Sequence, residues 1–202
     1  MEVLSKLFSS TALVKLLRLF LNNPDAVYET RDIVMRCKVS PEGARRELAL
    51  LRNIEFVQQK DYAIKTKHGN RTTSRRASGY FLNKHFPLNN ALRSLLFNAD
   101  PYRNDEILSK FKSAGRIKGL IVAGVFIQSE DSRVDILVIG DGLKRTNIEH
   151  SLRGMEAEVG KELNYAILDT KEFKYRLSIY DKFIRDILDY PHQILIDRIG
   201  LK

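Results

Sequence analysis

Basic side chains gather between residues 40 and 80, and they are the groups in this chain best suited to bind an anionic partner. Arg45 and Arg46 fall near the start of a helix predicted over residues 40–53. A guanidinium there can pair with O6 and N7 of a guanine, which discriminates that base by ~1–3 kcal/mol, or contact flanking phosphates. Seven Lys, Arg and His residues follow within positions 60–76, opposed only by Asp61. The candidate DNA-binding residues are Ser40, Glu42, Arg45, Arg46, Arg52, Lys60, Lys65, Lys67, Arg71, Arg75 and Arg76.

The helix and the basic stretch each have a plainer interpretation. Taken alone, Arg45 and Arg46 are explained equally well as solvated residues of an ordinary amphipathic helix and as DNA contacts. Taken alone, the basic stretch is a flexible loop that its charge keeps soluble. A helix followed at this offset by a basic wing favours binding along a phosphate backbone or in a minor groove.

A second group of residues has the spacing of a metal-dependent site. Gly124 precedes a short turn, and Ser132-Arg133-Val134-Asp135 then leads into an apolar run. Because side chains alternate along a strand, two carboxylates spaced by two point to one side and can hold divalent metals for nucleotidyl transfer. Here Arg133 occupies the first of those positions, and only Asp135 is acidic.

This pattern resembles the minimal nucleotidyltransferase domain, a DNA polymerase β-like fold that occurs fused to winged helices in prokaryotic regulators. The family pattern is Gly-Ser, a turn, Asp-x-Asp and an apolar strand, with a third carboxylate on the next strand. The resemblance covers about residues 117–190 and implies that Val125 replaces the serine. It also implies a degenerate site made of Gly124, Arg133, Asp135 and Asn164. Mg²⁺ depends on carboxylate charge, so we expect an inactive domain with no catalytic residue, metal or cofactor.

The Arg133 side chain has two interpretations. If its strand begins early, Asp131, Arg133 and Asp135 share a face, and the guanidinium pairs with Asp135 where active relatives hold a metal. Alternatively, Arg133 is solvated at the start of the strand. Micromolar Mg²⁺ affinity at Asp135 would exclude the first interpretation.

The helices that would position the basic residues come first in the chain. Apolar spacing predicts a helix over residues 5–21 and a short helix over residues 31–36 capped by Thr30. Ser40 as N-cap, followed by a proline, marks the start of the third helix. That helix is expected to bury Ala44, Leu48 and Leu51.

The segments after the third helix predict a hairpin. Residues 56–59 read as a strand, residues 60–79 as a polar basic loop and residues 80–82 as a return strand. Three helices followed by strand, loop and strand resemble the winged helix-turn-helix domain of ArsR-like transcriptional regulators.

The second half of the chain alternates between helices and strands, which predicts a small α/β domain with a mixed sheet and an α+β class overall. Helices are expected over residues 87–96, 105–113, 144–160 and 171–188. Strands are expected over residues 119–126, 134–139, 163–168 and 194–196. The expected division is a winged helix domain over 1–86, a helical linker over 87–116 and the nucleotidyltransferase-like domain over 117–202.

Charge and composition narrow the class further. Of the net charge of +9, residues 36–85 carry +8, which indicates a polyanionic partner for this stretch. Hydrophobic residues at 44% and charged residues at 29% argue against disorder. No apolar run approaches the ~20 residues that span a bilayer, and we expect no signal peptide and no membrane partner. The single cysteine, Cys37, reads as a buried core thiol in a cytoplasmic protein.

These observations lead to three functional hypotheses. The first is a cytoplasmic, homodimeric transcriptional regulator that reads double-stranded DNA, with its C-terminal domain as a non-catalytic scaffold for dimerisation or for a protein partner. The second is an antitoxin-like partner of a toxin–antitoxin pair. The third is an active, metal-dependent nucleotidyltransferase, which the loss of carboxylates at Arg133 and Asn164 disfavours.

Overall fold

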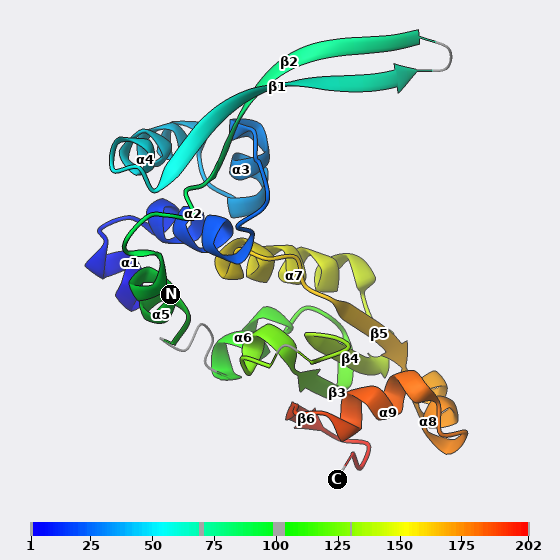
Figure 1. Ribbon diagram of the computed structural model, residues 1–202. Coiled ribbons are helices and arrows are strands. Elements are labelled where there is room, and N and C mark those ends of the chain that lie inside the picture. The colour runs from blue at the N-terminus through cyan, green and yellow to red at the C-terminus, as the bar shows by residue number, and fades with distance from the viewer. Residues whose placement is uncertain (1, 69–70, 99–103, 130, 202) are drawn as a thin grey trace. The chain divides into compact units, whose positions relative to one another are not determined.

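The protein is an α+β chain, which we describe from a computed structural model covering residues 2–68, 71–98, 104–129 and 131–201 (Figure 1). For residues 2, 64–68, 71–74 and 98 only the backbone is described. The chain divides into two compact units: Met1–Pro101 with Gly154–Lys161, and Tyr102–Arg153 with Glu162–Lys202. In the described ranges, no helix combines the length and apolar character that crossing a bilayer requires.

The first unit begins with two helices, where the apolar spacing predicted one over residues 5–21. α1 spans Glu2–Leu7 and α2 spans Thr11–Asn22. Ser9 adopts a left-handed conformation with φ of 53°, and the Ser10 hydroxyl accepts a hydrogen bond from the Leu13 amide at 3.1 Å. The prediction of one helix was wrong because this local cap interrupts a hydrophobic pattern that continues across it.

α3 (Thr30–Cys37) and α4 (Pro41–Asn53) follow, and their starts differ in quality. The prediction of Thr30 as a cap was wrong, since Thr30 is the first helical residue and Glu29 precedes it without a capping hydrogen bond. At α4 the prediction was confirmed: the Ser40 hydroxyl accepts from the Gly43 amide at 3.1 Å. The predicted core face of α4 is confirmed too, with each member at most 2% exposed: Ala44, Leu48 and Leu51.

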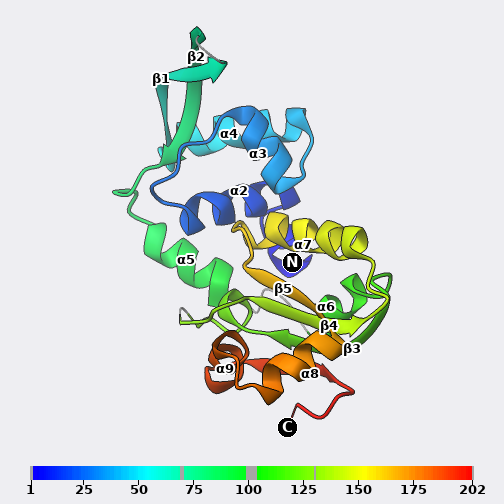
Figure 2. The ribbon, with the colours of Figure 1, turned by 90° about the vertical axis from the view of Figure 1, so that its right-hand side faces the viewer.

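The predicted basic loop over residues 60–79 is instead most of a long antiparallel hairpin. β1 (Val57–His68) pairs with β2 (Arg71–Leu82) from Val57↔Leu82 to His68↔Arg71. The loop prediction was wrong because β-branched and aromatic residues such as Thr66, Tyr62 and Ile64 favour extended chain, and ladder hydrogen bonds need no apolar side chains. Figure 2 shows this hairpin extending beyond α3 and α4.

The base of the hairpin joins the core of the first unit. Tyr28 and Tyr80 exchange backbone hydrogen bonds of 2.9 and 2.8 Å, so Tyr28, just before α3, forms an isolated antiparallel bridge with β2. Phe20 and Phe56, both fully buried, meet edge to face with centroids 6.5 Å apart. α5 (Asn89–Asn98) contributes the fully buried Leu96 to the same core. This helix falls within the segment expected as a linker.

The second unit contains a four-stranded mixed sheet in the order β5-β4-β3-β6. β3 is antiparallel to β4 and β6, and β4 is parallel to β5. The strands are β3 (Arg116–Val122), β4 (Ile136–Asp141), β5 (Tyr165–Asp169) and β6 (Gln193–Asp197). The sheet centre is apolar, and Ile121, Leu137 and Ile139 are fully buried.

Helices cover both faces of this sheet. The helices are α6 (Asn104–Lys110), α7 (Arg145–Val159), α8 (Thr170–Ser178) and α9 (Lys182–Asp189), with a single 3₁₀ turn at Gly124–Phe126. α8 and α9 lie on the face opposite α7 (Figure 2). The single helix predicted over residues 171–188 was wrong, because Tyr180 is left-handed with φ of 54° and the Asp181 carboxylate caps α9 through the Ile184 amide at 3.2 Å.

Candidate nucleic-acid interface and degenerate carboxylate site

One face of α4 is open to solvent and carries most of its charge. The buried side of the helix leaves the following residues exposed: Glu42, Arg45, Arg46, Ala49, Leu50, Arg52 and Asn53. Arg45, Ala49 and Arg52 are spaced i, i+4 and i+7, so they form one stripe along this face. The small Ala49 lets another molecule approach the helix backbone between two cations.

Arg46 has a partner inside the protein. Its Nε and Nη2 donate to Glu47 Oε1 at 3.1 and 2.8 Å, and the Ser10 hydroxyl donates to the same oxygen at 2.8 Å. The Glu47 side chain is only 6% exposed whereas that of Arg46 is 73% exposed. Glu47 therefore ties α4 to the cap of α2. Sequence reasoning missed this residue, although its helical position lies on the same side as Ala44, Leu48 and Leu51.

Arg52 links α4 to the hairpin. Its Nη1 donates to Gln59 Oε1 at 3.0 Å, and Gln59 Nε2 donates to the Ser78 hydroxyl at 2.6 Å. Gln59 lies on β1 and Ser78 on β2. The exposed stripe of α4 and one face of the hairpin are thus joined by side-chain hydrogen bonds.

The described cations of the hairpin differ in how far they are engaged. Arg75 donates to both oxygens of Glu29 at 3.3 and 2.8 Å, and this hydrogen bond raises the pKa of Arg75. Lys60 Nζ lies 5.3 Å from the centroid of the Phe81 ring. Within the described part of the chain, Arg45 and Arg76 have no ion-pair or hydrogen-bond partner. The side chains of the predicted contact residues Lys65, Lys67 and Arg71 lie outside the described residues.

The register divides the base of the hairpin into two faces. Gln58 is opposite Phe81, and Lys60 is opposite Gly79. The intervening pair, Gln59 and Tyr80, has the opposite orientation because side chains alternate. Gln59 faces α4 through Arg52, so the face with Lys60 and Phe81 is the other one.

In the second unit, the structure brings three of the four degenerate-site residues together. Asp135, 4% exposed, accepts at Oδ1 from the Val125 amide at 2.9 Å and at Oδ2 from the Asn164 amide at 2.8 Å. Gly124 is left-handed with φ of 53°, and a Cβ there would lie 2.1 Å from Asp135 Oδ1. Both carboxylate oxygens are therefore used to hold the turn at Gly124 and the start of β5 in place.

Arg133 is directed elsewhere, and its predicted pairing with Asp135 was wrong. Its Nε donates to Asp186 Oδ2 of α9 at 3.1 Å. The shared face predicted for Asp131, Arg133 and Asp135 required an early strand, whereas β4 begins only at Ile136. The interpretation of a solvated arginine is incomplete too, although the Arg133 side chain is 57% exposed. Its partner is 53 residues away in sequence.

Other reactive groups are also engaged in structure. Burial raises the pKa of the Cys37 thiol to about 12, so this cysteine is a core residue rather than a nucleophile. A hydrogen bond from Lys118, at 2.6 Å, lowers the pKa of Asp141 to about 2.

Among the described residues, no three His, Cys, Asp or Glu side chains are grouped to hold a metal. Comparisons with protein-family models, curated proteins and solved structures find no match to this chain.

Proposed function

We propose that the chain is a cytoplasmic transcriptional regulator whose first unit is a winged helix-turn-helix that binds duplex DNA. In this proposal α4 enters the major groove and the β1–β2 hairpin is the wing. The order α2, α3, α4, β1, β2, with the bridge from Tyr28 to Tyr80 of β2, supports it. The observation that carries it is the charge of +8 on residues 36–85, which include α4 and the hairpin.

The stripe of Arg45, Ala49 and Arg52 is the proposed reading surface. A major groove ~12 Å wide admits a helix, and the bases are contacted by side chains on its outward face. Arg45 meets this requirement best, because it is exposed and, among described side chains, has no competing partner. Arg46 and Arg75 are already paired with Glu47 and Glu29, so their expected part is to hold the surface together.

Selection of duplex DNA from a random library, followed by fluorescence anisotropy, tests this proposal. Arg45→Ala should weaken binding to the selected site by about five- to 150-fold and relax preference at one base, since a bidentate guanine contact is worth ~1–3 kcal/mol. Arg153→Ala is the matched control, as Arg153 is a helical arginine that is 69% exposed in the second unit. If about five phosphates are contacted per protomer, log K should fall with log[salt] at a slope of about −4 to −5.

Two results would overturn the proposal. The first is a protein that ignores duplex DNA even at very low ionic strength. The second is an unchanged base preference in Arg45→Ala, which would leave duplex binding but refute the reading role of α4.

For the second unit we propose a non-catalytic scaffold that forms a homodimer or binds a protein partner. Support comes from Asp135, whose two oxygens already accept backbone amides, and from Arg133, which pairs with Asp186. Large exposed side chains on α8 and the turn after it suit such a surface, with Tyr175 at 65% and Tyr180 at 76% exposure. Mg²⁺-dependent transfer of labelled nucleotide that Asp135→Ala abolishes would overturn this assignment. Sedimentation of the purified chain tests the dimer.

A further inference from the structure

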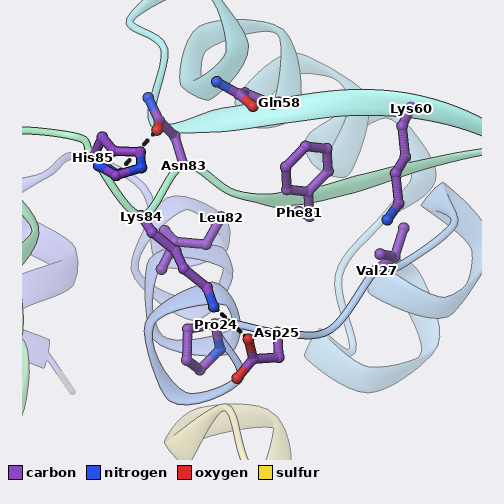
Figure 3. A pocket seen from close by; sticks show the side chains of 10 residues that line it. All are labelled: Pro24, Asp25, Val27, Gln58, Lys60, Phe81, Leu82, Asn83, Lys84 and His85. Atoms are coloured by element: carbon purple, nitrogen blue, oxygen red, sulfur yellow. Dashed lines mark hydrogen bonds and ion pairs between the residues drawn. The ribbon is translucent and has the colours of Figure 1, made fainter.

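A pocket of about 330 Å³ opens at the base of the hairpin in the first unit. Its walls come from the loop before α3, the start of β1 and the end of β2 with the residues after it. Figure 3 shows the Phe81 ring beside the Lys60 side chain, with Lys84 directed toward Asp25 beyond Leu82 and with His85 next to Asn83. Small-molecule sites typically begin at ~300 Å³ and combine apolar walls with a few polar groups.

The groups in this pocket favour a negatively charged ligand. Lys60 Nζ lies 5.3 Å from the Phe81 centroid. Lys84 forms an ion pair with Asp25, and their side chains are 56% and 84% exposed, so solvent weakens the pair and the ammonium group can exchange partners. Phe81 offers a half-buried ring on which a flat group can pack. Two lysines and one aspartate leave the lining positively charged.

We propose that this pocket binds a small organic anion that carries an aromatic ring, either an aromatic carboxylate or a nucleoside monophosphate. The ring packs against Phe81 and the anionic group pairs with Lys60, while Lys84 adds positive charge at the other end of the pocket. The Gln58 amide, on the same face of the hairpin, is available to orient polar atoms of the ligand.

In this pocket the ligand contacts the face of the hairpin that is opposite to the face next to α4. It contacts Gln58, Lys60 and Phe81, whereas the adjacent Gln59 faces Arg52 of α4. A bound ligand therefore stabilises one arrangement of β1 and β2. The opposite face of these two strands lies next to the stripe of Arg45, Ala49 and Arg52 on α4. That the ligand regulates DNA binding rests on the proposed function, whereas its binding to the pocket does not.

Titration of ¹⁵N-labelled protein without DNA tests the binding. Benzoate and adenosine monophosphate are the two probes, with cyclohexanecarboxylate and inorganic phosphate as comparisons that carry the anionic group but no aromatic ring. We expect one of the probes to shift the amides of residues 58–60 and 81–85 with a dissociation constant of about 1 mM or tighter. Failure of both probes to shift these amides overturns the proposal, and so does equally tight binding of the matched comparison that has no aromatic ring.

Variants then assign the contacts. Lys60→Ala and Lys84→Ala should each weaken binding about two- to fivefold, as for exposed charge pairs. Phe81→Leu keeps apolar bulk and should weaken it about two- to tenfold. Lys174→Ala, an exposed lysine of α8, is the control and should leave binding unchanged. Equal losses in the control and the pocket variants would overturn the assignment.

A final measurement separates this inference from the proposed function. Duplex affinity is measured by anisotropy with and without the probe that binds, in wild type and in Lys84→Ala. If the probe shifts these amides but the protein does not bind duplex DNA, the proposed ligand pocket stands and the proposed function is rejected. If the protein binds duplex DNA but the probes do not shift the amides of residues 58–60 and 81–85, the proposed function stands and the ligand pocket is rejected.

Discussion

Asp135→Asn should destabilise the second unit by about 1.5–3 kcal/mol, because one charge-assisted hydrogen bond is replaced by two opposed donors. The carboxylate accepts from the Val125 amide at 2.9 Å and from the Asn164 amide at 2.8 Å. An asparagine offers one acceptor and turns its NH₂ toward the other amide. Since Asp135 is 4% exposed, little water is available to compensate. At about 4–8 °C per kcal/mol for a small domain, its thermal midpoint falls by roughly 6–24 °C.

Hydrogen exchange of the β4 backbone amides, measured by NMR at increasing urea concentrations, gives the free energy of unfolding of the second unit separately from that of the first. Asp131→Asn is the matched control, an exposed aspartate four positions earlier, and should change stability by less than about 0.5 kcal/mol. Gly124→Ala should resemble Asp135→Asn, because its Cβ would displace the same carboxylate oxygen. Equal stability of Asp135→Asn and Asp131→Asn would refute this reasoning. Mg²⁺ that stabilises wild type but not Asp135→Asn would refute the non-catalytic assignment.

Three further predictions concern single side chains. Glu47→Ala should destabilise the first unit by about 1–3 kcal/mol in urea unfolding, since Ser10 loses its buried acceptor, and Arg46→Ala should cost less than about 1 kcal/mol; equal costs would contradict this. Because burial raises the pKa of Cys37 to about 12, an aromatic disulfide reagent at pH 8 should react only as the chain unfolds. The lowered pKa of Asp141, about 2 against 3.8, means that its ionised form stabilises the fold above pH 4 and that this contribution is lost as the pH falls toward 2. An acid titration of Asp141→Asn should lack that component, and a profile identical to wild type would contradict the assignment.

Features set by neighbouring residues were the ones that the sequence predicted well. Ser40 followed by a proline gave the start of α4, because a cap depends on atoms three residues apart. The α+β class and the mixed sheet followed from the alternation of apolar segments. The break at Ser9 and Ser10 was missed, since hydrophobic spacing alone does not register a left-handed residue.

Features that depend on distant partners were not predictable in the same way. The hairpin from β1 to β2 is held by strand pairing, and its polar composition resembled a loop. Arg133 finds Asp186, and Arg75 finds Glu29, across 53 and 46 residues of sequence. Spacing along one segment could not identify either pair, because each depends on how separate elements pack. The burial of Glu47 could have been predicted from the sequence, because its position on the helical wheel of α4 falls on the buried side.

The carboxylates of the second unit and the cations of α4 and the hairpin differ in how far they are engaged. In the second unit, the carboxylates of Asp135, Asp141, Asp169 and Asp186 each bind an amide or a cation of the same unit. In the first unit, Arg45 and Arg76 have no such partner among the described side chains. The Asp135 oxygens that accept backbone amides have fewer lone pairs left for a metal, whereas arginines without a partner gain contacts when a polyanion docks. Together with the charge of +8 on residues 36–85, these contacts favour DNA binding by α4 and the hairpin over metal-dependent chemistry at Asp135 as the activity to assay first.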